Sequence, residues 1–141
     1  MKKILTLLFV LQFTIASSQV ITGQAYMQQT VMGMQKGFGL RIQNNSSWGV
    51  GLLHQSNLIS NGEGTQERYP FYGLEFIAPL TKCGNMQLFL APKAGFVNEY
   101  FFILIPEVET ELKISAHFST AITAGIRARQ ASTGLKILIH F

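Results

Sequence analysis

The chain has 141 residues with 11 basic and 7 acidic side chains, which gives a formal net charge of +4. Its hydrophobic fraction is 48%, its charged fraction is only 13%, and its mean hydropathy is +0.24. A soluble domain usually carries about twice this share of charge, and a disordered chain is far less apolar. After residue 16, however, no apolar run approaches the roughly 20 residues that a membrane-spanning helix needs. The composition therefore favours a membrane protein that is built from strands.

Residues 1–18 have the pattern of a secretory signal peptide. Lys2-Lys3 is a basic start, residues 4–16 are an apolar stretch too short to span a bilayer, and residues 16–18 resemble a cleavage site. Cleavage would leave 19–141 as a single domain. Losing two lysines would lower the formal charge from +4 to +2. The basic character is therefore no sign of nucleic-acid binding.

Apolar and polar residues alternate through almost the whole remaining chain, with the period of two that is typical of β-strands. The clearest case is 104–114, where Glu107, Glu109 and Glu111 all fall on one face. A helix would spread these glutamates around its surface, whereas a strand puts them on one side. We therefore predict eight strands, each near the roughly 9–11 residues of a tilted membrane strand. Their expected ranges are 20–29, 36–44, 48–56, 68–80, 86–96, 102–114, 119–129 and 133–141.

Alternation alone leaves open which face of the strands points into a barrel. In a soluble barrel the apolar face points inward, whereas in an outer-membrane barrel it points out into lipid. The signal peptide, the even number of strands and the aromatic end of the last strand favour the outer-membrane arrangement. Aromatic residues also gather near the expected strand ends, as they do in interfacial girdles. These residues are Trp48, Tyr69, Phe71, Tyr72, Phe96, Tyr100, Phe101, Phe102 and Phe141.

The polar face of the strands carries a nearly balanced set of charges. An unpaired charge inside a narrow barrel costs several kcal/mol, but opposite charges on neighbouring strands can pair. We therefore expect an interior ion network, with glycines on the same face leaving room for long side chains. An eight-stranded barrel is just wide enough to be filled by side chains, so we expect a packed lumen and no open pore. The expected network is Arg41, Glu75, Lys93, Glu107, Glu109, Glu111, Lys113, Arg127, Arg129 and Lys136.

These strands together resemble the small eight-stranded outer-membrane β-barrels of the OmpA/OmpX type over the whole of 19–141, and their glycine-rich character is similar to small barrels of Bacteroidota. The resemblance implies an all-β, antiparallel, up-and-down transmembrane barrel, surrounded by the outer-membrane lipid of a Gram-negative cell. It also implies insertion by the barrel assembly machinery, which reads the C-terminal strand ending at Phe141. With both termini in the periplasm, the outward-facing connections would be 30–35, 56–67, 97–101 and 130–132.

One short motif also resembles an active site. His54-Gln55-Ser56-Asn57 is similar to the His-x-Ser-Asn motif of the outer-membrane lipid A deacylases, which are also eight-stranded barrels. The resemblance implies His54 as base, Ser56 as nucleophile and Glu67 as the acid that orients the histidine, while Asn57 could stabilise an oxyanion. Residues two apart lie on the same side of a strand, which suits proton transfer from serine to histidine. Even positions of this strand face lipid, however, so His54 is also explained as an interfacial residue.

The other polar clusters point less clearly to chemistry. His117-Phe118-Ser119 repeats the His-x-Ser spacing, but in an expected periplasmic turn with no acid nearby. The glutamates at 107, 109 and 111 could attract a cation, yet Arg127, Arg129 and Lys93 on neighbouring strands would supply counter-charges. Cys83 is the single cysteine and the histidines are far apart. No cluster has the spacing of a zinc site, so we expect neither a metal nor a cofactor.

We favour a non-enzymatic outer-membrane barrel with a structural or surface-interaction role. Its outer loops, chiefly 56–67, would present a surface to an extracellular partner, and nothing indicates nucleic-acid binding. Two alternatives remain open at this stage. The first is a hydrolase similar to the lipid A deacylases, with His54 and Ser56 in its active site. The second is a soluble periplasmic barrel that binds a small apolar ligand.

Overall fold

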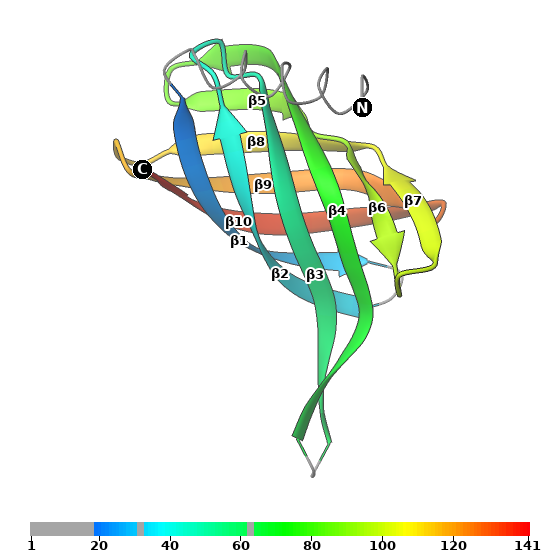
Figure 1. Ribbon diagram of the computed structural model, residues 1–141. Helices are drawn as coiled ribbons and strands as arrows, with labels where there is room; N and C mark the ends of the chain where they lie inside the picture. The colour runs from blue at the N-terminus through cyan, green and yellow to red at the C-terminus, as the bar shows by residue number, and fades with distance from the viewer. Residues whose placement is uncertain (1–18, 31–32, 62–63) are drawn as a thin grey trace, which may run out of the picture.

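The computed structural model describes residues 19–30, 33–61 and 64–141, without the side chains of 58–61 and 64–67. The predicted signal peptide, residues 1–18, lies outside the described residues. Within them, ten antiparallel strands follow the order β3-β2-β1-β10-β9-β8-β5-β4-β6-β7, and pairing of β3 with β4 closes a barrel (Figure 1). The strands are β1 Val20–Thr30, β2 Gly33–Gln43, β3 Gly49–Asn61, β4 Gly64–Cys83, β5 Met86–Leu90, β6 Lys93–Val97, β7 Phe101–Ile105, β8 Glu107–Lys113, β9 Phe118–Arg127 and β10 Gln130–His140.

The ten strands make eight passes across the barrel. β5 and β6 are one pass interrupted at Pro92, and β7 and β8 are one pass interrupted at Pro106. Across both breaks, β6 pairs with β7 and β5 with β8 in one continuous register. The predicted eight-stranded, antiparallel, up-and-down barrel is therefore confirmed. No helix among the described residues is long and apolar enough to cross a membrane.

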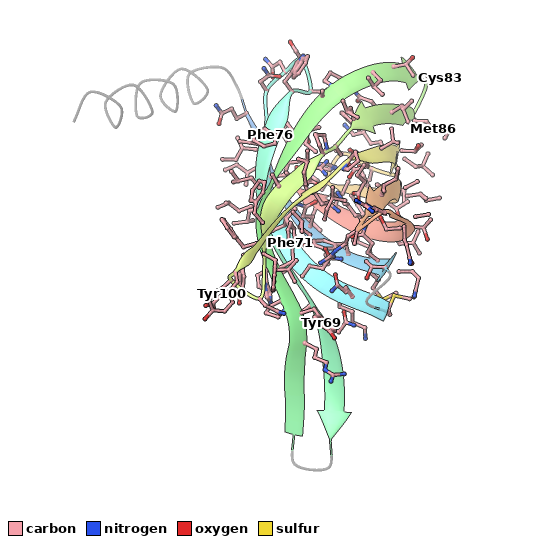
Figure 2. The ribbon with its side chains drawn as sticks, turned by 90° about the vertical axis from the view of Figure 1, so that its right-hand side faces the viewer. Tyr69, Phe71, Phe76, Cys83, Met86 and Tyr100 are labelled. Atoms are coloured by element: carbon pink, nitrogen blue, oxygen red, sulfur yellow. The ribbon has the colours of Figure 1, made fainter. Side chains whose placement is uncertain are left out.

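Prolines also lie at the two register shifts of β4, because a proline nitrogen cannot donate a ladder hydrogen bond. The pairing of β4 with β5 shifts at Pro79, and its pairing with β3 shifts at a β-bulge where Ser56 faces both Tyr69 and Pro70. Tyr69 has a φ of 50° there. A bulge bends the strand that contains it. Beyond the bulge, β3 and β4 continue past the other strands as a two-stranded extension (Figures 1 and 2).

The outer wall of the barrel is apolar and its inner face carries the charges. Leu52, Leu104 and Ile122 are 64%, 65% and 62% exposed, whereas Arg41 and Glu109 are fully buried. These are the faces of a transmembrane barrel, in which hydrocarbon meets lipid and polar groups line the interior. The alternative of a soluble barrel with an inward apolar face is therefore wrong.

The lumen also contains two apolar clusters, which the alternation of polar and apolar residues did not predict. One is Tyr26, Leu53, Phe71, Val97 and Ile105, and the other is Ile77, Phe89 and Ala91. On β4, Phe71 and Ile77 lie on either side of Glu75 and belong to different clusters. The lumen is therefore layered along its axis, with charged residues between two apolar groups.

Phe71 was expected in an aromatic girdle at the membrane interface, and this prediction was wrong. Its side chain is fully buried inside the barrel (Figure 2). Phe71 shares the inward parity of Glu75, four residues along the same strand. Gly73 provides the space, because a Cβ at this position would lie 2.6 Å from the Phe71 ring. Part of the room left by the inward glycines is therefore filled by an aromatic side chain.

Candidate functional site

A ring of ion pairs crosses the middle of the lumen. Arg41 of β2 donates two hydrogen bonds to Glu109 of β8, at 2.9 Å from Nη1 to Oε1 and 3.0 Å from Nη2 to Oε2. The same Nη2 lies 3.1 Å from Oε2 of Glu75 on β4. Lys136 of β10 contacts both carboxylates through its Nζ. None of these four strands is a neighbour of another in the sheet, so the contacts span the lumen.

A second ion pair joins this ring. Lys93 of β6 lies 2.7 Å from Oε1 of Glu107 on β8, and the Nζ of Lys136 is 3.9 Å from the same oxygen. The resulting group is balanced, with three cations and three carboxylates, and all of its side chains are buried. We call this group the central cluster. Its members are Arg41, Glu75, Lys93, Glu107, Glu109 and Lys136.

Glutamines extend the hydrogen bonding of the central cluster. Gln24 donates to Oε2 of Glu75 at 3.0 Å, and Gln28 donates to Oε2 of Glu107 at 2.7 Å. Gln55 in turn donates to Oε1 of Gln28 at 2.9 Å. These glutamines were not among the predicted network residues, which were all charged. The signal was present, since Gln24 and Gln28 occupy one parity of an alternating strand.

The central cluster has consequences for what the lumen can do. A bidentate arginine–carboxylate pair fixes both distance and orientation. Removing one partner would leave an uncompensated buried charge, which is strongly unfavourable. The cross-lumen bonds therefore hold opposite walls of the barrel at a fixed spacing and fill its middle with side chains.

Three carboxylates of the central cluster are close enough together to be considered as a metal site. One oxygen each from Glu75, Glu107 and Glu109 lies within 4.8 Å of the others. Arg41 and Lys136 contact two of these glutamates, however, and a lysine ammonium contacts the third. These cations already neutralise the carboxylates and would repel a metal ion. The arrangement therefore fits an internal ion network better than a metal centre.

The structure places the other four predicted network residues outside the central cluster. Glu111 lies toward the turns, where Oε1 is 3.5 Å from Nε2 of His140. The predictions for Lys113 and Arg129 were wrong, because both side chains are exposed. Lys113 is the last residue of its strand, beyond the enclosed lumen, and Arg129 belongs to a two-residue turn. Arg127 does point inward but joins none of the ion pairs among the described residues.

A polar basin of about 340 Å³ opens between the turns at the end of the barrel that holds the C-terminus. His140 lies at its edge, with Nδ1 2.9 Å from the Thr22 hydroxyl and Nε2 2.8 Å from the Ser119 hydroxyl. Ser119 of the second His-x-Ser sequence therefore contacts His140. The ring of His117 lies 3.2 Å from the backbone oxygen of His140. Residues that line the basin include Gln43, Lys82, Gln87, Glu111, Lys113 and His140.

His54, the expected base of the deacylase-like motif, lies between two aromatic rings on the outer face. Its ring stacks on Tyr72 at 4.5 Å between centroids and meets the edge of Phe38 at 5.5 Å. Ser56 is buried at the β-bulge, with 3% of its surface exposed. The side chain of Glu67 lies outside the described residues. The catalytic assignment of these three residues therefore stays a prediction.

No protein-family model and no curated protein matches the chain. Among solved structures, a de novo designed transmembrane β-barrel matches with a TM-score of 0.65 at 6% sequence identity, over 86% of this chain and 95% of that chain. Ail, the attachment invasion locus protein of Yersinia pestis, solved with the heparin analogue sucrose octasulfate, matches with a TM-score of 0.42 at 10% identity, over 87% and 94%. Neisserial surface protein A matches with 0.43 at 11% identity, over 86% and 94%. The match to the designed barrel, the one of these three with a TM-score above 0.5, shows that the chain has the fold of a transmembrane β-barrel.

Proposed function

We propose that the chain is a closed outer-membrane barrel that holds a projecting hairpin at the cell surface, without catalytic or channel activity. The central cluster carries this proposal. Its ion pairs join four strands that are not neighbours, so the side chains cross the lumen. The residues of these pairs are Arg41, Glu75, Glu109 and Lys136. A lumen held shut in this way supports a role for the outer surfaces of the barrel.

The extension of β3 and β4 is the part best placed to meet a partner. The two strands remain paired from Asn57 opposite Arg68 to Asn61 opposite Gly64, beyond the rim of the barrel (Figure 1). Tyr69 and the 83% exposed Tyr100 lie near the base of this extension (Figure 2). Tyrosines of this kind are typical of the membrane–water interface. The hairpin would then project from the membrane surface into solvent.

The orientation of the barrel follows from its connections. The C-terminus and the start of β1 lie at the end opposite the β3–β4 extension, which is the longest excursion of the chain beyond the barrel. In outer-membrane barrels the short turns are periplasmic and the longer loops are extracellular. The same proposal includes export through residues 1–18 and cleavage before Gln19. It also includes insertion by the barrel assembly machinery, through the strand that ends at Phe141.

Two epitope tags test the location and the orientation together. One is inserted in the β3–β4 connection, and a matched tag is inserted in the β4–β5 turn between Gly84 and Asn85. Antibody should label intact cells that carry the first tag, and should label the second only after the outer membrane is opened. Gel mobility that changes on heating confirms that both tagged barrels fold. Labelling of the second tag alone in intact cells would contradict the proposed orientation, and labelling of neither would contradict surface display.

Conductance tests the closed lumen. The purified barrel, added to a planar lipid bilayer, should produce no steady open current because the central cluster fills the cross-section. A stable current from the folded wild-type protein would contradict this part of the proposal without affecting its location.

A further inference from the structure

Arg127 is a buried cation that no acidic side chain among the described residues balances. Its residue is 1% exposed, its Nη1 donates to Oε1 of Gln35, and its guanidinium carbon lies 5.3 Å from the centre of the Phe71 ring. None of the acidic side chains among 19–30, 33–57 and 68–141 forms an ion pair with it. A guanidinium remains charged at any ordinary pH, so the loss of a proton cannot relieve the unfavourable free energy of burying this charge.

The described carboxylates of the lumen contact other groups than Arg127. The central cluster is already neutral, with three carboxylates bound to three cations. Glu111 lies toward the opposite end of the barrel, beside His140. Arg127 is therefore the one excess charge among the fully buried side chains that the structure describes. A buried charge without a partner is strongly unfavourable, and an anion that bound to it would remove this penalty.

The donor groups of Arg127 are arranged for such an anion. Its Nε and Nη2 atoms have no hydrogen-bond partner within the described protein. In a guanidinium, the Nε–H bond and one Nη2–H bond point in the same direction and match two oxygens of a carboxylate, phosphate or sulfate. Gln35 holds the other side of the group, and its own Nε2 lies 3.5 Å from the backbone oxygen of Tyr69. The free edge of the guanidinium is therefore held in place by an amide and a ring.

The position of Arg127 determines where a ligand would enter. Arg127 is the last residue of β9, and the turn that follows lies at the same end of the barrel as the β3–β4 extension. Its partner Gln35 is the third residue of β2, close to the β1–β2 connection at that end. Both side chains point inward, away from the lipid-facing wall. A ligand would therefore approach through the outer rim from the aqueous side.

We infer that Arg127 binds the oxyanion group of a small carboxylate, phosphate or sulfate compound within the outer end of the lumen. Two oxygens of the ligand accept hydrogen bonds from Nε and Nη2, Gln35 positions the guanidinium, and Phe71 shields one of its faces from water. Burial strengthens a charge-assisted pair of this geometry, because water competes less with it. The inference concerns a ligand of the lumen and goes beyond the proposed role of the outer hairpin.

Titration of the purified, folded barrel in a non-ionic detergent, which supplies no oxyanion of its own, tests the site, with inorganic phosphate and acetate as the two probes. The reference titration uses sodium chloride at the same ionic strength. We expect saturable binding of at least one oxyanion at one site per barrel, measured by calorimetry. The preference between phosphate and acetate identifies the class of oxyanion. If the wild-type protein binds neither phosphate nor acetate, the inference is wrong.

Three variants separate the paired donors from charge in general. R127Q removes the charge and the donor pair, and R127K keeps the charge but cannot offer two parallel N–H groups. R129Q is the matched control, because Arg129 lies two residues away in the same hairpin with an exposed side chain. We expect R129Q to bind like the wild type and R127Q to bind at least about tenfold more weakly, as the loss of a charge-assisted hydrogen bond implies. Equal binding by wild type, R127K and R127Q would overturn the site.

A fourth variant keeps the inference testable if R127Q does not fold. Q35E places a carboxylate where Arg127 Nη1 now meets an amide oxygen, so it supplies an internal counter-charge. We expect Q35E to raise the unfolding midpoint in chloride buffer and to weaken oxyanion binding, because the excess charge is already neutralised. A Q35E barrel that binds the oxyanion as tightly as the wild type, without any gain in stability, would show that the charge of Arg127 does not drive binding.

Discussion

In the middle of the barrel, each buried charge meets an opposite charge from another part of the wall, whereas at the outer end Arg127 is buried against an amide and an aromatic ring. The two regions also differ in how much of their backbone is strained. Of the six described non-glycine residues with positive φ, all but Ser47 lie at the outer end; these are Tyr69, Asn98, Glu99, Ala128 and Arg129. Strain of this kind costs free energy and persists where the surrounding structure compensates for it. The difference indicates that the middle of the barrel stabilises the fold. The outer end, in contrast, contains strained backbone and a buried charge that no described acidic side chain pairs with, which are typical of functional regions.

The largest expected effect comes from breaking the charge balance of the middle. Glu109→Gln removes the carboxylate that pairs with both Arg41 and Lys136, so the central cluster keeps three buried cations but only two carboxylates. We expect the free energy of unfolding to fall by roughly 3–5 kcal/mol, as for other broken buried ion pairs. Urea titration of the barrel in lipid vesicles measures this, with Trp48, the single tryptophan, as the fluorescent reporter.

Two further variants show whether the loss belongs to the central cluster. Glu99→Gln changes an exposed glutamate in the β6–β7 turn, and we expect almost no change in its unfolding midpoint. Arg41→Gln combined with Glu109→Gln leaves Glu75 paired with Lys136, so the double variant should lose less than the sum of the single losses. Additive losses would mean that Arg41 and Glu109 do not act as a pair, and the contrast with the outer end would fail.

The alternating sequence predicted the faces of the strands well, but it did not indicate where each strand leaves the barrel. The inward placement of Glu107 and Glu109 follows from parity alone. Lys113, at the end of β8, and Arg129, in the turn after β9, have the parity of the inward residues of those strands, yet both are exposed because the enclosed lumen ends before them. Strand ends depend on turn geometry and on the tilt of the barrel. An alternation of polar and apolar residues carries no information about either.

The pairing of charges across the lumen was also beyond the sequence. We expected pairs between neighbouring strands, and Lys93 does lie in the pass next to Glu107. Arg41 and Glu109, in contrast, come from β2 and β8, which are not adjacent in the sheet. Such a contact depends on the radius of the barrel and on the length of both side chains. Alternation along single strands cannot determine either quantity.

A medium effect of opposite sign should follow from relieving strain at the outer end. Ala128 and Arg129 connect β9 to β10 with φ values of 51° and 65°. Two consecutive positive φ values define a type I′ turn, which prefers Asn-Gly. Replacing the pair with Asn-Gly should stabilise the barrel by about 1 kcal/mol, since other L-residues pay a steric penalty in this region. The urea midpoint in vesicles should therefore rise.

The opposite turn provides the control for this change. Gly84 has a φ of 59°, and a Cβ at this position would meet no atom within 4 Å. Gly84→Ala therefore tests backbone strain without a steric clash, and it should destabilise the barrel by about 1 kcal/mol. If Asn-Gly at 128–129 is neutral while Gly84→Ala is destabilising, the outer turn is not strained and that part of the comparison is wrong.

The smallest expected effect tests whether the outer end has catalytic activity. The ring of His54 is held between Phe38 and Tyr72 on the lipid-facing wall, an arrangement that an interfacial side chain explains without catalysis. We expect lipid A from cells that express Ser56→Ala or His54→Ala to have the same mass spectrum as lipid A from cells with the wild-type barrel. Loss of an acyl chain with the wild type but not with Ser56→Ala would establish the deacylase alternative, provided that both barrels fold. The bulge at Ser56 would then serve to position a nucleophile, and the outer end would be a catalytic region as well as a binding surface.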